Sequence, residues 1–272
     1  MHQKVLVVFT YLVTKDIVET LERKIGYQLN KELKRYVKGL ENQFLTNFWQ
    51  FVPTRIEKRA IDAPSVSAKL DDISRSNGTP VISLDRVYIP SAQEFLEVTR
   101  QTNQETGQVK IAERPGALSI EEQVEKIREY KEIVLADVGA FEGTTILDIC
   151  DLLSQRDIKV DEIVLGISSN EANKKLNKTR KVSALNLFNF YEWIELRDLF
   201  GIDGRNIGIR NGKREFIPYW ENLCKWASIS TENRDEVERL CKKFNSELIG
   251  KLWQEGYDLN RIGRPVKYLG KK

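Results

Sequence analysis

The stretch that decides the fold is Glu132–Thr145, which reads EIVLADVGAFEGTT. Its apolar run ends on an acid, Asp137, and the loop that follows carries Gly139 and Gly143 before two threonines. This order predicts a strand, a turn and the N-terminus of a helix. Glycine lets the backbone approach an anion, and the first N–H groups of a helix have no partner within that helix. The stretch therefore predicts a phosphate site.

The residues around this stretch extend it into a strand–helix–strand unit. Apolar side chains recur at helical spacing from Ile146 to Leu153, and Glu162–Ile167 has the composition of a buried strand. Strands joined in this way run parallel, so the sheet is expected to be parallel and mostly buried. Val81–Leu84 and Gln108–Ala112 predict two further strands. The predicted fold class is α/β, with an open, mostly parallel sheet flanked by helices.

Helices are predicted in the segments before this unit. Apolar residues recur at helical spacing in Asp16–Leu29 and Lys31–Phe51, and Ser91–Thr99 is expected to be a helix as well. Ser119 and Glu122 have the spacing of a capping box, which marks the start of one more helix.

Aromatic residues gather in the C-terminal part, in Leu187–Leu199 and Ile217–Trp226, and a helix is predicted over Thr231–Leu252. Aromatic clusters of this kind more often form a core or an interface than a platform for nucleic-acid bases. We expect residues 1–185 to form the α/β core with an N-terminal helical elaboration. Residues 186–272 are expected to be a helical, aromatic-rich extension packed on that core, and the surface for a protein partner or a second copy of the chain.

The composition argues against several classes of chemistry. The chain has 272 residues and one histidine, His2, which argues against histidine bases, catalytic triads and histidine metal sites. Cys150, Cys224 and Cys241 lack the spacing of a metal site, so no metal ligands are predicted and the thiols are expected to be reduced, in a cytoplasmic protein.

Charge and hydropathy give further expectations. The net charge of +3 is too small to indicate nucleic-acid binding by charge alone. The sequence contains no run of 18 apolar residues, so no membrane-spanning helix is expected. Lys4–Tyr11 is predicted to be a strand or the start of a buried helix. The apolar stretch Lys4–Val13 lacks the basic front and the small-residue cleavage site of a signal peptide, which favours a first core strand.

Two acidic positions follow predicted strands. Asp137 ends the strand at residues 133–137, and Asp85 with Arg86 follows the strand at Val81–Leu84. Ligands of open α/β sheets bind at the carboxyl ends of the strands, so these residues are expected to meet at one site.

The run Asp137-Val-Gly-Ala-Phe-Glu-Gly-Thr-Thr resembles the PRPP-binding signature of type I phosphoribosyltransferases. The resemblance covers roughly residues 80–170 and implies that family's fold. The usual second acid is missing, because Ala136 or Val138 occupies its place, and the loop carries Phe141 and Glu142. The chain therefore looks like a divergent member, of the kind found in prokaryotic conflict and defence systems.

The resemblance also implies roles for residues. Asp137 would hold the ribose hydroxyls of PRPP, which binds together with Mg²⁺, and Arg86 would neutralise the leaving pyrophosphate. These two are the expected catalytic residues. The expected ligand-binding residues are Asp85, Asp137, Gly139, Ala140, Phe141, Glu142, Gly143, Thr144 and Thr145.

Other interpretations remain open. The threonines are equally explained as helix caps, and Glu142 as a solvated loop acid. The fold is also compatible with a non-catalytic nucleotide sensor or a scaffold subunit. The same glycine loop resembles motif I of S-adenosylmethionine-dependent methyltransferases, although Ser168 and Ser169 stand where that family expects an acid.

Overall fold

The computed structural model describes residues 8–75, 78–103, 105–114, 117–202, 207–210 and 213–259. Its central sheet has the strand order β4-β3-β7-β8-β9, and every neighbouring pair in it is parallel. The strands are β3 (Val81–Ser83), β4 (Glu94–Phe95), β7 (Glu132–Ala140), β8 (Lys159–Ser169) and β9 (Lys181–Phe188). The predicted strand–helix–strand unit is therefore present, with α5 (Thr144–Ser154) between β7 and β8.

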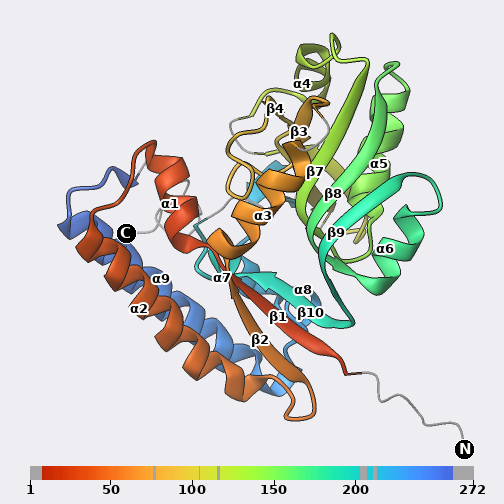
Figure 1. Cartoon of the computed structure of the whole chain (residues 1–272). Coiled ribbons are helices and arrows are strands. Elements are labelled where there is room, and N and C mark those ends of the chain that lie inside the picture. The colour runs from red at the N-terminus through yellow and green to blue at the C-terminus, as the bar shows by residue number, and fades with distance from the viewer. Residues whose placement is uncertain are drawn as a thin grey trace, which may run out of the picture.

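The two faces of the central sheet are covered by different helices (Figure 1). Ile133 and Leu135 of β7 lie in one hydrophobic cluster with α5, α4 (Ile120–Lys126) and α6 (Asn170–Leu176). Val134 and Ala136 lie in another cluster, with α3 (Ala63–Arg75). Alternate residues of a strand point to opposite faces, so a fully apolar strand is buried on both sides.

A second parallel sheet has the order β10-β1-β2 and joins the two ends of the chain. Its strands are β1 (Thr10–Lys15), β2 (Glu57–Asp62) and β10 (Phe190–Glu195). The helices α1 (Ile17–Ile25), α2 (Lys31–Phe48) and α9 (Arg234–Gln254) extend from it as a helical arm (Figure 1). Phe44 of α2 packs on Phe244 of α9, with ring centroids 5.3 Å apart. One hydrophobic core is thus shared by the N-terminal and C-terminal segments.

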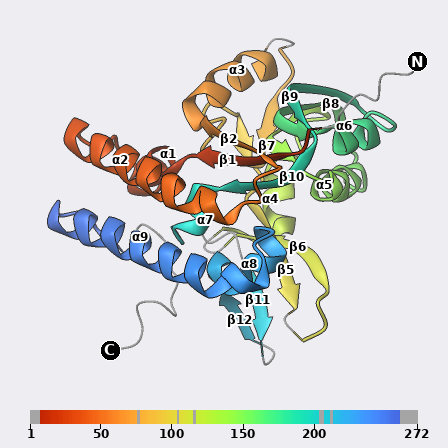
Figure 2. The ribbon, with the colours of Figure 1, turned by 90° about the horizontal axis from the view of Figure 1, so that it is seen from below.

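A third sheet has the order β12-β11-β5-β6 (Figure 2). It consists of β5 (Val98–Asn103), β6 (Val109–Glu113), β11 (Ile207–Arg210) and β12 (Lys213–Phe216). The strand predicted at Gln108–Ala112 is therefore confirmed as β6. The helix predicted over Ser91–Thr99 is wrong, because β4 and the start of β5 occupy that segment. Glu94–Phe95 completes the edge of the central sheet beside β3, which is a tertiary pairing that helical spacing does not reveal.

The remaining short elements connect these layers. They are α7 (Leu196–Leu199), α8 (Leu223–Trp226), η1 (Trp49–Phe51), η2 (Tyr219–Asn222) and η3 (Thr231–Asn233). The capping box at Ser119 and Glu122 is present at the start of α4. The predicted fold class is confirmed: mostly parallel sheets flanked by helices, with an aromatic-rich helical C-terminal part. The boundary expected at residue 185 lies within β9, and the division into two domains stays a prediction.

No helix within the described residues is both long enough and apolar enough to cross a membrane.

Candidate functional site

A cavity of about 520 Å³ lies at the carboxyl end of the central sheet. One wall is the loop after β7 with the start of α5, and Asp85 lies beside it after β3. The other walls come from β5, β6, β10 and the segment around α8. All the residues expected to bind ligand, from Asp137 and Gly139 to Thr145 together with Asp85, line this one cavity.

The end of β7 and the loop that follows it, residues 139–143, need their glycines. A Cβ atom at Gly139 would lie 2.4 Å from the carbonyl oxygen of Ile167 and 2.9 Å from the ring of Trp193. Gly143 has a left-handed backbone, with φ of 74°, and stands at the N-cap of α5 without a side-chain cap. No side chain of the described residues therefore caps the first turn of α5, which faces the cavity as a partial positive charge.

The loop is held in place from behind. The Ser169 hydroxyl donates to the carbonyl oxygen of Phe141 at 2.6 Å, and accepts from the Ala172 N–H at 2.8 Å. The Phe141 ring stacks on Phe190, with centroids 5.4 Å apart. Phe141 therefore anchors the loop to β10. Ser169, at the end of β8, thus fastens this loop, which gives a structural reason for a serine there in place of an acid.

Glu142 lies on the exposed side of the loop. The Thr144 hydroxyl is 3.5 Å from its carboxylate, and Lys175 of α6 is 3.4 Å from its carbonyl oxygen. Solvent and Lys175 thus reduce the repulsion that this carboxylate exerts on an anion at the helix N-terminus.

Asp137 is half-buried in the wall of the cavity, and the N–H of Val138 donates to its Oδ1 at 2.8 Å. The strand was expected to end at Asp137, but β7 continues to Ala140. Asp137 is therefore paired within the sheet, opposite Leu165 of β8, three residues before β7 ends. The two places for a second acid hold Ala136 and Val138, which are buried against the α3 face.

A buried ion cluster forms the wall next to Asp85. The Arg197 guanidinium is 1% exposed and contacts the carboxylates of Asp16 at 3.1 Å, Asp85 at 2.6 Å and Glu195 at 2.5 Å. Arg114 of the segment after β6 is 3.9 Å from Asp85. These carboxylates follow β1 and β3 or end β10, so Arg197 ties the second sheet to the central sheet.

The carboxylates of this cluster titrate differently. Burial raises the pKa of Asp85, but Arg197, Arg114 and the N–H of Val87 outweigh it and hold the pKa at about 2. Asp16 has its pKa raised, because burial outweighs the single guanidinium beside it. Asp85 is therefore a fixed negative charge that orients both arginines.

Arg86 does not belong to the described lining of the cavity. Its guanidinium pairs with Glu97 at 3.0 Å and lies 4.7 Å above the Phe95 ring. The guanidinium groups in the cavity wall are instead those of Arg100, Arg114 and Arg197.

Glu192 of β10 supplies another carboxyl group to the cavity. The Ser228 hydroxyl donates to its Oε2 at 2.7 Å, and the Trp193 N–H donates to its Oε1 at 2.9 Å. Burial raises the pKa of Glu192 to about 7, although these hydrogen bonds and Arg100 lower it in part. A carboxyl group that titrates near neutrality can accept or donate a proton at the ligand.

Sequence reasoning missed Glu192, Arg114 and Arg197. Arg197 follows the end of β10 closely, as Asp85 follows β3, so the strand-end rule would have selected it if Phe190–Glu195 had been recognised as a strand. The aromatic residues of this segment favour a core or an interface, and they obscure the alternation of side chains that marks a strand.

The comparisons with known proteins add structural likeness only. No protein-family model matches the chain, and the search of curated proteins finds no relative. Similar solved structures include TT1426 from Thermus thermophilus, with 15% identity, a TM-score of 0.32, and coverage of 46% of this chain and 83% of that one.

Two other similar structures are named as phosphoribosyltransferases. The orotate enzyme of Aeropyrum pernix has 12% identity and a TM-score of 0.29, over 46% of this chain and 71% of that one. The adenine enzyme of Thermoanaerobacter pseudethanolicus has 14% identity and a TM-score of 0.28, over 46% of this chain and 79% of that one. The function is therefore inferred from the site itself.

Proposed function

We propose that the cavity binds a ribose 5-phosphate ligand, PRPP with Mg²⁺, and that the protein is a phosphoribosyltransferase. The observation that carries this proposal is the α5 N-terminus, which has no side-chain cap and faces a cavity whose other walls hold guanidinium groups. A ligand with an anionic group at each end of a small polar body fits that charge pattern.

The residues have separate roles in this proposal. The N–H groups at the start of α5 and the hydroxyls of Thr144 and Thr145 hold the 5-phosphate. Asp137 accepts from the ribose hydroxyls. Arg114 and Arg100 face the pyrophosphate, and stabilise the negative charge that develops as it leaves C1.

Glu192 is the proposed proton acceptor for the attacking nitrogen. Its pKa of about 7 leaves it partly ionised at neutral pH, and Ser228 and the Trp193 N–H fix its orientation. A base with a pKa near the working pH is the most effective one.

The described residues suit Mg²⁺ only as part of the ligand. They contain no group of three or more His, Cys, Asp or Glu side chains that could hold a metal ion. Mg²⁺ in phosphate sites is commonly held by phosphate oxygens, waters and one or two carboxylates. Asp137 is the carboxylate placed for this, and the ion would supply charge neutralisation to the pyrophosphate.

A second candidate is a binding protein that does not turn PRPP over. It is favoured by the buried apolar residues Ala136 and Val138 at the places of the second acid, and by the engagement of Asp85 with Arg197. A role in a prokaryotic defence system remains a prediction from the sequence resemblance alone.

Calorimetry with PRPP and Mg²⁺ tests the proposal, with ribose 5-phosphate and S-adenosylmethionine as comparison ligands. Asp137→Asn removes the charge proposed to meet the ribose, and we expect it to weaken PRPP binding roughly tenfold or more. Asp148→Asn is the matched control, because Asp148 is exposed on α5 and is not among the cavity-lining residues.

Four results separate the candidates. PRPP binding with pyrophosphate release supports the transferase, and PRPP binding without release in a screen of nitrogen acceptors supports the sensor. Binding of S-adenosylmethionine alone, or equal losses in Asp137→Asn and Asp148→Asn, would contradict a ribose-phosphate site.

A further inference from the structure

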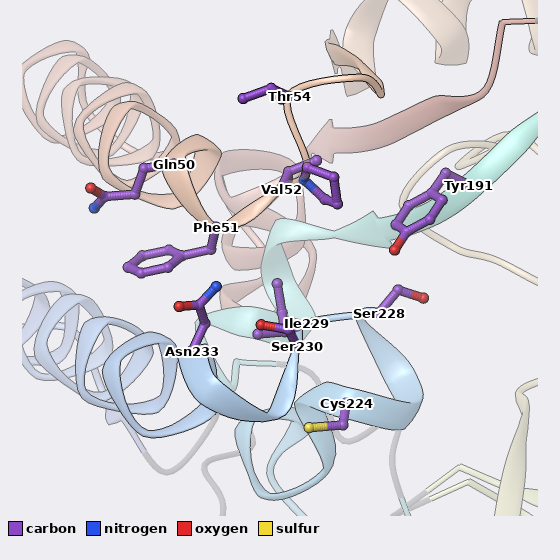
Figure 3. A pocket seen from close by; sticks show the side chains of 11 residues that line it. Gln50, Phe51, Val52, Thr54, Tyr191, Cys224, Ser228, Ile229, Ser230 and Asn233 are labelled. Atoms are coloured by element: carbon purple, nitrogen blue, oxygen red, sulfur yellow. The ribbon is translucent and has the colours of Figure 1, made fainter.

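Ser228, which follows α8 (Figure 3), has an unusual backbone conformation. It lines the cavity at the carboxyl end of the central sheet, here called the main cavity. Its φ is 48°, in the left-handed region that favours glycine because a Cβ atom crowds the backbone there. Backbone strain of this kind persists where the surrounding structure enforces it, and it is common at functional sites.

The side chain of Ser228 has a partner in the main cavity. Its hydroxyl donates to Oε2 of Glu192 at 2.7 Å, and the N–H of Trp193 donates to Oε1 at 2.9 Å. Two donors, one on each oxygen, hold the carboxylate in one orientation. Glycine would fit the backbone at position 228 better, but it would remove the donor to Oε2.

The peptide group that precedes Ser228 is held by Tyr11 of β1. The Tyr11 hydroxyl donates to the carbonyl oxygen of Ala227 at 2.5 Å. This carbonyl group and the N–H of Ser228 belong to one planar peptide unit, so any rotation of the unit changes the φ of Ser228. The Tyr219 hydroxyl donates to the carbonyl oxygen of Trp226, and thereby holds the preceding peptide unit instead.

Tyr11 occupies a fixed place in the core. Its side chain is fully buried, and its ring packs edge-on against Phe48 and Trp49, with centroids 5.8 Å and 6.1 Å away. Burial is the main cause that raises the pKa of Tyr11 well above 10, so its hydroxyl keeps its proton and stays a donor at neutral pH. The Ala227 carbonyl is therefore held from the core that the helical arm shares with the second sheet.

We propose that Tyr11 is a positioning residue for Glu192. Its hydroxyl fixes the peptide unit between Ala227 and Ser228, and the left-handed Ser228 then directs its own hydroxyl at the Glu192 carboxylate. The inference rests on the proposed function, in which Glu192 is the proton acceptor. The arrangement itself belongs to the free protein and needs no PRPP.

The pKa of Glu192 in the free, full-length chain tests this arrangement. NMR of ¹³C-labelled glutamate carboxyl groups measures it, and Glu192→Gln assigns the resonance. We expect about 7 in the wild type. The Ser228 hydrogen bond lowers this pKa, so Ser228→Gly is expected to raise it by about one unit. Arg100 of β5 and the Trp193 N–H, which also lower it, remain in this variant.

Tyr11→Phe keeps the buried ring and removes only the hydroxyl. Because Tyr11 is neutral, this change removes no charge near Glu192, yet it is expected to raise the pKa of Glu192 as Ser228→Gly does. In a Ser228→Gly background it is expected to have no further effect, because Tyr11 acts through Ser228. Tyr130→Phe is the matched control, since Tyr130 packs in the cluster around α5 and is not among the cavity-lining residues.

A comparison of Ser228→Gly with Ser228→Ala tests the backbone separately. Both variants lack the hydroxyl and are expected to raise the pKa of Glu192 equally. Only glycine relieves the left-handed strain, so Ser228→Gly is expected to melt a few degrees above Ser228→Ala.

The proposal is overturned if Tyr11→Phe leaves the pKa of Glu192 unchanged, or raises it equally with and without Ser228. It is also overturned if Tyr130→Phe has the same effect, or if the glycine and alanine variants melt at the same temperature. Failure of PRPP to bind would contradict the proposed function and leave these pKa shifts in place, so the two proposals fail separately.

Discussion

Replacing Arg197 with methionine is expected to destabilise the protein strongly. The guanidinium is buried among the carboxylates of Asp16, Asp85 and Glu195 at 2.5 to 3.1 Å. Methionine has a similar length but no charge, so three buried carboxylates would lose this ion-pair partner, and Arg114 would remain 3.9 Å from Asp85. Removal of one partner from a buried ion pair costs about 3–5 kcal/mol.

The pKa of Asp85 gives a second estimate of the free energy of unfolding that Arg197→Met would lose. Arg197 and Arg114 hold this pKa at about 2, below the ordinary value of 3.8. At about 1.4 kcal/mol for each pKa unit, Asp85 alone contributes about 2.5 kcal/mol at neutral pH. Asp16 does not add to this value, because its raised pKa means that its ionised form costs stability at neutral pH. A loss of that size is a large fraction of the roughly 5–15 kcal/mol that stabilises a typical protein.

Urea denaturation, followed by tryptophan fluorescence, measures how much the free energy of unfolding falls in Arg197→Met. Arg128→Met is the control, because Arg128 pairs with Glu125 at 3.2 Å on the surface and is expected to cost less than about 1 kcal/mol. If Arg197→Met were no more destabilised than Arg128→Met at pH 7, the buried cluster would not hold the two sheets together.

The pH dependence gives a further check on this variant. In the wild type, the contribution of Asp85 is present above pH 3.8 and is lost as the pH falls towards 2, because its folded pKa is depressed. Without Arg197, this carboxyl group is expected to have a folded pKa above 3.8 and to be more easily protonated. The difference in unfolding free energy between the wild type and Arg197→Met should therefore shrink as the pH falls from 7 to 4. A difference that stays constant would refute an electrostatic cause.

Two other substitutions test the surroundings of the site. Gly139→Ala is expected to cost about 1–3 kcal/mol in urea denaturation, because its Cβ would lie 2.4 Å from the Ile167 carbonyl oxygen and 2.9 Å from the Trp193 ring; wild-type stability would show that the loop has room. Glu41 is buried, and burial raises its pKa to about 8, although the Ile17 N–H donates to it at 3.1 Å. Because the folded pKa is raised, the wild type loses stability as the pH rises from 4.5 to 8. The unfolding free energy of Glu41→Gln should therefore rise relative to that of the wild type by up to about 5 kcal/mol over this range. Parallel pH profiles of the two proteins would contradict this.

Local patterns in the chain predicted the centre of the fold correctly. The apolar run before Asp137, the glycines after it and the helical spacing from Ile146 onward are each formed by residues close in sequence. Strand and helix periods and glycine conformations are local properties, so a short window contains them. The same window led to the glycine loop and Asp137, which line the main cavity.

The rest depended on residues that lie far apart in the chain. Asp16, Asp85 and Glu195 meet at Arg197 only because β1, β3 and β10 end at the same place. Arg86, one residue from Asp85, turns instead to Glu97. Side-chain direction and ion pairing follow from which strands become neighbours, and strand pairing is decided by burial of the whole sheet rather than by any one segment. A pocket of about 510 Å³, lined by Tyr191 and by residues of 50–54 and 224–233, likewise forms only in the tertiary structure (Figure 3). These segments share no local pattern, and they become neighbours because N-terminal and C-terminal segments pack into one core.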